Sequence, residues 1–342
     1  MRLTFLGVLT ALLSPALVAV VVPTPADAAP PRLVSRAVVL DVENTNATSA
    51  LCVPDNQSYR LRARLVGPPR AIQGRSGPLR VNVLVHDEGT GSWFWHLRGR
   101  GLAGYDYASR LAARGETSLV IDRLGYGASG RPTSTCLGAQ ADMLHQVVQH
   151  LRSGRYDFAD ARLGSTPAAA SVVTHGLGVG AAIAQVEAAT FDDVAGLVLM
   201  SWTDRTATQL AQEELARQRA ACLTGSATAP AAGAAELRHQ LFAVAPARVQ
   251  RAAVARRAAV PCGDVLSRAP MRLASGLGAA QVDAPVLLLY GGADALTRPE
   301  ARSAQAAAYP TKVTTRTFAG AGSALPLERP GPVAATVLRW LR

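Results

Sequence analysis

The stretch Val172–Gly180 reads VVTHGLGVG, and it joins a short β-branched run to a cluster of glycines. Ser171–Thr174 predicts a strand, and Val179–Thr190 predicts the helix that follows it. The same alternation recurs on both sides of this stretch. The other predicted strands are Val81–Val85, Ser118–Ile121, Val194–Met200, Val286–Tyr290 and Lys312–Phe318, and the other predicted helices are Tyr105–Arg114, Asp142–Arg152 and Pro332–Leu341. This order predicts an α/β fold in which helices flank a mostly parallel central sheet.

Two segments lie outside this alternation. Tyr59–Leu65 predicts an early edge strand. Residues 206–273 show only helical patterns around one loose stretch, Thr224–Gly233, that is rich in Gly, Ala, Thr and Pro. We therefore expect one domain over residues 29–342, with a helical cap insert at about 206–273 that lies over the sheet.

The composition is that of a globular chain with a large core, because 49% of its 342 residues are hydrophobic and only 17% are charged. The formal net charge is +11. A nucleic-acid-binding protein is expected to gather its basic residues on one patch or helix. Here they are spread along the chain, apart from a modest cluster at Arg248, Arg251, Arg256 and Arg257. We therefore expect no nucleic-acid partner.

The N-terminus has the pattern of a signal peptide. Arg2 precedes the apolar run Phe5–Val22, and the small-residue site Ala26-Asp27-Ala28 follows. An uncleaved anchor is the alternative, but Ser14 and Pro15 interrupt the run. We expect residues 1–28 to be cleaved near Ala28, and the mature chain to be secreted and to have no membrane span.

Four cysteines remain after that segment, and an even number in an exported chain favours disulfides. Four cysteines allow three pairings, and the sequence does not choose among them. Cys52 and Cys136 both lie in the first half of the chain, whereas Cys222 and Cys262 bracket one helical segment. We take Cys52–Cys136 and Cys222–Cys262 as the working assignment. No CxxC or His/Cys spacing for zinc occurs, so we expect no metal site and no cofactor.

Five blocks of sequence together resemble the α/β-hydrolase superfamily. In chain order they are VNVLVHDEGTGSWFW at 81–95, DRLGYGASGRP at 122–132, VVTHGLGVG at 172–180, LLLYGGADAL at 287–296 and FAGAGSALPLE at 318–328. They are similar to the oxyanion loop, the DxxGxGxS turn, the nucleophile elbow, the acid loop and the histidine loop of a secreted bacterial member. The resemblance covers about residues 58–342 and implies the α/β-hydrolase fold.

The resemblance also maps a catalytic triad, and two of its three positions are changed. The elbow motif GxSxG aligns with Thr174–Gly178, which puts Gly176 in the place of the nucleophile. Asp294 stands at the acid position, and Ser323 stands where the family has histidine. Glycine has no side chain that could attack, and serine is no base near neutral pH. This mapping implies a degenerate triad.

The oxyanion loop departs from the family as well. Its HG pair is His86-Asp87, and the backbone N–H donors are expected from Glu88 and Leu177. Ionised carboxylates here would oppose a negative charge that develops nearby. We interpret His86 and His175 as structural residues near the pocket.

Aromatic residues of the first block complete the predicted site. We expect Trp93 and Trp95 to line or plug the pocket mouth and the cap helices to roof it. The pocket should lie outside the carboxyl ends of the strands, between the sheet and the cap.

Three hypotheses about function follow. The leading one is a catalytically impaired pseudohydrolase that binds a hydrophobic small molecule, an ester-like ligand, or a protein partner whose nature is unknown. The alternative is an active esterase or lipase-like hydrolase with a relocated catalytic set, because fold does not imply function. A sequence error or engineered inactivation is a third explanation, but it does not account for Thr174, Gly176, Asp87 and Ser323 together.

Overall fold

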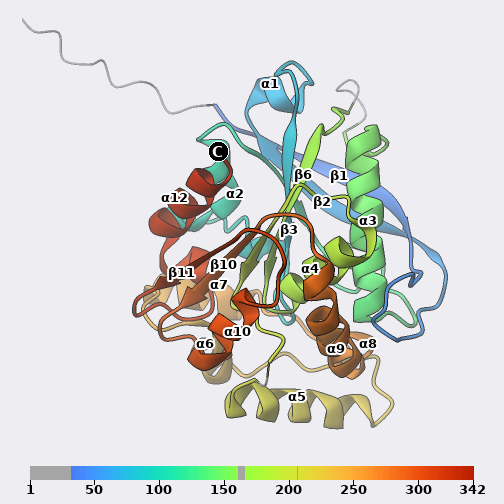
Figure 1. Ribbon diagram of the computed structural model, residues 1–342, viewed down its shortest axis with the longest axis vertical. Coiled ribbons are helices and arrows are strands. Elements are labelled where there is room, and N and C mark those ends of the chain that lie inside the picture. The colour runs from blue at the N-terminus through green and yellow to red at the C-terminus, as the bar shows by residue number, and fades with distance from the viewer. Residues whose placement is uncertain (1–31, 161–165, 206) are drawn as a thin grey trace, which may run out of the picture. The chain divides into compact units, whose positions relative to one another are not determined.

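The computed structural model describes residues 32–160, 166–205 and 207–342 (Figure 1). The predicted signal peptide, residues 1–28, lies outside these ranges. Within them, nine strands form one sheet in the order β11-β10-β7-β6-β3-β4-β2-β1-β5. Their bounds are β1 Val34–Glu43, β2 Ser58–Gly67, β3 Arg80–Val85, β4 Thr117–Ile121, β5 Asp157–Phe158, β6 Ser171–Leu177, β7 Gly196–Met200, β10 Val286–Gly291 and β11 Val313–Phe318.

The strands from β4 to β11 in this order run parallel to one another, whereas β1, β2 and β5 join by antiparallel pairing. The predicted mostly parallel sheet is therefore confirmed. The edge assignment of Tyr59–Leu65 is wrong, because β2 lies between β4 and β1. The sequence pattern also predicted no strand at Val34–Glu43, which pairs along the full length of β2.

Helices cover both faces of the sheet. In Figure 1, α2 and α12 lie on one side and α3 and α4 on the other. Successive residues of a buried strand point to opposite faces, so Val83 packs with one helical layer and Leu84 with the other. The bounds of these and the remaining flanking helices are α1 Pro69–Ile72, α2 Tyr107–Ala112, α3 Leu137–Ser153, α4 Val179–Phe191, α10 Pro299–Ala306, α11 Leu325–Glu328 and α12 Pro330–Trp340, with 3₁₀ turns at Ser92–Phe94, Ala103–Tyr105 and Ala279–Gln281.

A mainly helical segment separates β7 from β10. It comprises α5 Gln209–Cys222, α6 Ala234–Leu241, α7 Ala247–Ala255, α8 Cys262–Leu266 and α9 Arg268–Gly278. The expectation of helices alone is wrong, because Thr228–Ala229 (β8) and Val260–Pro261 (β9) pair as a short antiparallel ribbon. Figure 1 shows α5 at one end of this unit, below α8 and α9.

Two covalent links and one buried ion pair hold the loops together. Both assigned disulfides are present: the S–S distance is 2.00 Å in Cys52–Cys136 and 2.02 Å in Cys222–Cys262. Arg123, after β4, places Nη1 2.8 Å from Oδ2 of Asp264 in α8, and both side chains are fully buried. The helical segment is thus tied to the sheet by a charge pair. In the described ranges, no helix combines the length and the apolar character needed to cross a bilayer.

Candidate functional site

The sharp turn between strand and helix occurs at Gly178. β6 continues through Leu177, which pairs with Met200 of β7, and α4 begins at Val179. Gly178 between them has φ +53° and ψ −121°. Such a backbone strains any residue with a Cβ atom, and nucleophile elbows adopt a strained turn of this kind.

The placement of the elbow at Gly176 is therefore wrong by two residues. Gly176 lies inside β6, opposite Val85 of β3. A Cβ atom there would lie 2.3 Å from Cα of Ala181 and 2.4 Å from the backbone oxygen of Gly180. Gly176 is thus the position that lets the start of α4 pack directly on the strand.

The carboxylate of Asp87 occupies the space beside the turn. Its Oδ1 accepts a hydrogen bond from the N–H of Glu88 at 2.8 Å and another from the N–H of Val179 at 2.8 Å. The expected donors were Glu88 and Leu177, and the second is replaced by Val179 because the turn comes two residues later. A Cβ atom on Gly178 would lie 2.3 Å from Oδ2 of Asp87. The missing side chain at 178 therefore leaves the space that this carboxylate fills.

Asp294 and Ser323 meet as expected. Ser323 Oγ lies 2.7 Å from Oδ1 of Asp294 and 2.9 Å from the backbone oxygen of Gln240, and its single proton serves one acceptor at a time. Asp294 Oδ2 is buried without a hydrogen-bond partner among the described residues. Oδ1 also accepts from the N–H of Leu296 at 2.8 Å. The loops after β10 and β11 thus bring the predicted acid position and the predicted histidine position into contact.

Comparison with known proteins places the chain in a family. The pattern of the "Alpha/beta hydrolase family" matches residues 83–336. This chain belongs to the alpha/beta hydrolase family. No curated protein sequence gives a significant match to the hydrolase-family chain.

Solved structures share the fold of this hydrolase-family chain. A thermophilic esterase from Thermogutta terrifontis has a TM-score of 0.59 and 20% identity, over 87% of this chain and 98% of that one. A monoacylglycerol lipase from Paleococcus ferrophilus has a TM-score of 0.59 and 18% identity, over 82% and 98%. An esterase from Exiguobacterium antarcticum has a TM-score of 0.59 and 14% identity, over 83% and 96%. At these identities the likeness establishes the fold.

Two adjoining cavities open next to the turn of this hydrolase-family chain. The inner one, about 100 Å³, is lined by Asp87, Gly178 and polar side chains from the loops after β7 and β10. The outer one, about 600 Å³, lies among α5, α9 and α10. Arg268 and Arg272, one turn apart on α9, line both cavities. A polar chamber beside the turn therefore continues into a larger, mainly apolar groove.

An ion pair lines the inner cavity beside Asp87. Glu88 forms an ion pair with Arg268. Burial lowers the pKa of Arg268 to about 10, and the nearby Asp87 opposes that shift. Burial raises the pKa of Asp87 to about 6, whereas the hydrogen bond from Val179 and the charge of Arg268 act to lower it. Asp87 therefore titrates close to neutral pH.

The two histidines near the turn do not line either cavity. His86 Nδ1 lies 2.8 Å from the backbone oxygen of Asp87, and His86 Nε2 accepts a hydrogen bond from the backbone N–H of Arg123. His175 is held between the Tyr107 hydroxyl and the Asn82 amide. Burial lowers the pKa of His175 to about 3 and that of His86 well below its ordinary value. Both imidazoles are therefore neutral and fixed by hydrogen bonds at physiological pH.

The predicted aromatic mouth is wrong for these cavities. Trp95 is completely buried and packs against Phe94, with ring centroids 4.9 Å apart, and against Tyr107 at 5.4 Å. Trp93 contacts Phe94 at 6.1 Å, and neither tryptophan lines the two cavities. Trp95 belongs to the core layer on the α2 side of the sheet, and the partly buried Trp93 packs against that layer.

Sequence reasoning missed Gly178, Val179 and the two arginines of α9. The signal for the first was present: the frame Gly176–Gly180 reads GLGVG and keeps both flanking glycines of GxSxG, whereas the frame Thr174–Gly178 keeps one. Arg268 and Arg272 carry no motif. Only the packing of α9 beside the turn brings them to the site.

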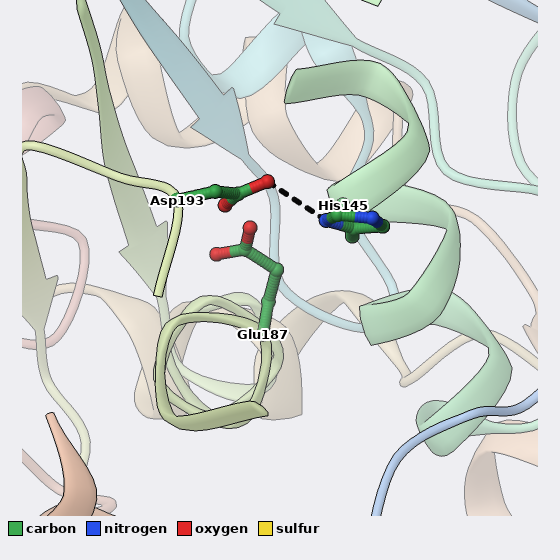
Figure 2. Close-up of side chains that lie close together, drawn as sticks. All are labelled: His145, Glu187 and Asp193. Carbon is green, nitrogen blue, oxygen red and sulfur yellow. Dashed lines mark hydrogen bonds and ion pairs between the residues drawn. The ribbon is translucent and has the colours of Figure 1, made fainter. Parts of the chain in front are cut away.

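One further group of possible metal ligands lies away from these cavities. It consists of His145, Glu187 and Asp193 on the α3–α4 side of the sheet (Figure 2).

Proposed function

We propose that this chain is an exported pseudohydrolase: it keeps the hydrolase scaffold, lacks triad-dependent hydrolysis, and binds an amphipathic small molecule between α5 and α9. The observation that carries the proposal is the position of Asp87. Its carboxylate accepts from the N–H groups of Glu88 and Val179, the donors that an oxyanion would need. Export is supported by the pattern of residues 1–28 and by the two disulfides.

Three chemical requirements of acyl transfer are unmet at this site. With Gly178 at the elbow, the nucleophile position itself carries no side chain that could attack. Ser323 stands beside Asp294 where a proton-accepting imidazole would be required. None of the chain's six histidines, all within the described ranges, lines the inner cavity. An anionic carboxylate bound to the two N–H donors would also repel a developing oxyanion.

The lining of the two cavities supports an amphipathic ligand. In the inner cavity, Gln218 Oε1, Gln240 Nε2 and Thr297 Oγ1 are buried without hydrogen-bond partners in the described structure. Buried polar atoms normally have partners, so these three favour a polar head group. On the rim of the outer groove, Leu273 and Leu277 are 65% and 68% exposed, which favours an apolar body packed over them.

A relocated nucleophile is the second candidate, and one observation favours it. Ser201, after β7, lines the inner cavity and has φ +51°, a strained backbone for a residue with a side chain. Its Oγ donates to the backbone oxygen of Ser323 at 2.9 Å. No imidazole adjoins it in the described structure, so the geometry supplies no base to activate this hydroxyl.

Ester hydrolysis by the purified chain tests the loss of activity. Wild type should hydrolyse short and medium p-nitrophenyl esters no faster than buffer and should not react with a serine-directed phosphonate. The single variant Gly178→Ser should be equally inactive. The triple variant Asp87→Gly/Gly178→Ser/Ser323→His is the smallest repair with all three groups in place. Robust wild-type turnover blocked by the phosphonate would refute the proposal, and Ser201→Ala would then identify the serine.

Binding is tested separately with decanoate as the probe. We expect saturable, micromolar to millimolar binding by calorimetry, and we expect Leu277→Asp in the outer groove to weaken it at least tenfold. Leu223→Asp is the matched control, because Leu223 is 76% exposed and lines neither cavity. Equal effects of the two substitutions would contradict binding in the groove.

A further inference from the structure

Three potential metal ligands converge between α3 and α4. His145 lies on α3, Glu187 lies on α4, and Asp193 follows the end of α4. Each offers one ligand atom, and these atoms all lie within 4.8 Å of one another. Figure 2 shows the carboxylates of Glu187 and Asp193 and the ring of His145 turned toward a common space. The sequence spacing, 145, 187 and 193, contains no recognisable metal motif.

The carboxylate of Glu187 is the unusual member. Glu187 is completely buried, and neither of its oxygens has a hydrogen-bond partner in the described structure. Asp193 Oδ1 is unpartnered as well. An unpartnered buried carboxylate is costly, and such groups normally bind a cation or hold a proton.

We propose that His145, Glu187 and Asp193 form a binding site for a divalent transition metal ion of the Zn²⁺ class. One imidazole nitrogen and two carboxylate oxygens are ligands that Zn²⁺ accepts, and water would complete four-fold coordination. Zinc bonds of about 2.1 Å require ligand atoms roughly 3.5 Å apart, so small side-chain rotations suffice. This inference does not depend on the proposed function, because the site is distinct from the two cavities.

The surroundings hold the ligands in place and give solvent access. Gln149 Nε2 donates to Asp193 Oδ2 at 2.7 Å, and Arg152 donates to the backbone oxygen of Asp193. Phe191 stacks on the His145 ring with centroids 3.9 Å apart. The His145 side chain is 26% exposed, which leaves an entry path for an ion. Ligands fixed by such outer contacts bind metals more tightly.

Proton sharing is the competing explanation, and it makes a different prediction. Burial and the neighbouring Asp193 raise the pKa of Glu187 well above its ordinary value, so the acid can be neutral and donate to Asp193. In the structure, Asp193 Oδ2 lies 2.7 Å from His145 Nδ1. Zn²⁺ binding would release the Glu187 proton to solvent. The affinity should therefore fall as pH decreases.

The variant Glu187→Gln separates the two explanations. Glutamine has the shape of protonated glutamate and still donates to Asp193, so proton sharing predicts unchanged stability and no dependence on metal. The metal site predicts that the chelator-treated wild type binds one Zn²⁺ per chain, measured by calorimetry and elemental analysis, and unfolds at a higher temperature with Zn²⁺. Glu187→Gln should weaken Zn²⁺ binding by more than roughly 10–100-fold, the loss that is typical when a residue that only hydrogen-bonds a metal ligand is replaced.

Two further variants keep the test decisive. His145→Gln changes a partly exposed ligand, so it should fold and should also lose the bound ion even if Glu187→Gln does not fold. His239→Ala removes an exposed histidine of α6 and should leave binding unchanged. Absence of Zn²⁺ from folded wild type, wild-type affinity in His145→Gln, or an equal loss in His239→Ala would each overturn the proposal. Mn²⁺ and Ca²⁺ titrations should give weaker binding than Zn²⁺.

Discussion

Serine at position 178 should be strongly destabilising, and the same substitution should cost less in a chain that already lacks the Asp87 carboxylate. The backbone of Gly178, at φ +53° and ψ −121°, costs a residue with a Cβ roughly 1–3 kcal/mol. The new Cβ would also lie 2.3 Å from Asp87 Oδ2, so the carboxylate must leave its two N–H donors. Hydrogen bonds to charged groups contribute about 1.5–3 kcal/mol each to stability, and hydrogen bonds to water would compensate for part of what the displaced carboxylate loses. We therefore expect Gly178→Ser to cost about 4–6 kcal/mol.

The double variant Asp87→Gly/Gly178→Ser gives the coupling between the two positions. Asp87→Gly alone should cost about 3 kcal/mol through the same two hydrogen bonds. The double variant cannot lose those bonds twice, so it should be about as stable as Gly178→Ser alone. The double-mutant cycle should then show non-additivity of about 3 kcal/mol.

The free energy of unfolding is measured by urea denaturation with the disulfides intact, and Gly77→Ser is the control variant. Gly77 has φ +74°, and a Cβ atom added there would have no other atom within 4 Å, so serine carries backbone strain without displacing a neighbour. If Gly178→Ser costs no more than Gly77→Ser, or if the cycle is additive, Asp87 does not fill the space beside the turn.

Three further predictions concern the same framework. Gly176→Ala should destabilise the fold by roughly 3 kcal/mol or more, because its Cβ would meet the backbone of Ala181 rather than a movable side chain; thermal unfolding measures this. Asp87 has a folded pKa of about 6, above the roughly 3.9 of an unfolded aspartate, so the proton stabilises the fold at low pH. The stability of wild type relative to Asp87→Asn should decline from about pH 4 to about pH 6 and then stay level; a flat difference would contradict the shift. Arg123→Met should cost about 3–5 kcal/mol by leaving the Asp264 charge buried and unpaired, and Arg123→Met/Asp264→Leu should recover most of that loss.

The prediction of a degenerate triad does not depend on the register of the elbow. Gly176 and Gly178 both lack a side chain, so either frame of VVTHGLGVG predicts that the nucleophile position carries no attacking group. Asp294 follows the apolar run of β10, Ser323 follows the β-branched run of β11, and carboxyl ends of neighbouring parallel strands lie at one edge of a sheet. Their 2.7 Å contact was therefore predictable from the order of the elements.

Local sequence determined the element order and the α/β class, because hydrophobic periodicity is a local property. Where β6 ends was decided by tertiary structure. The β-branched run ends at Thr174, but β3 pairs with β6 as far as Gly176 and β7 pairs with it as far as Leu177, so the strand continues and the turn falls at Gly178. The location of the Asp87 carboxylate was decided in the same way. It depends on the N–H of Val179 and on the space beside Gly178, both supplied by a turn about 90 residues away in sequence, and only the packed sheet brings them to Asp87.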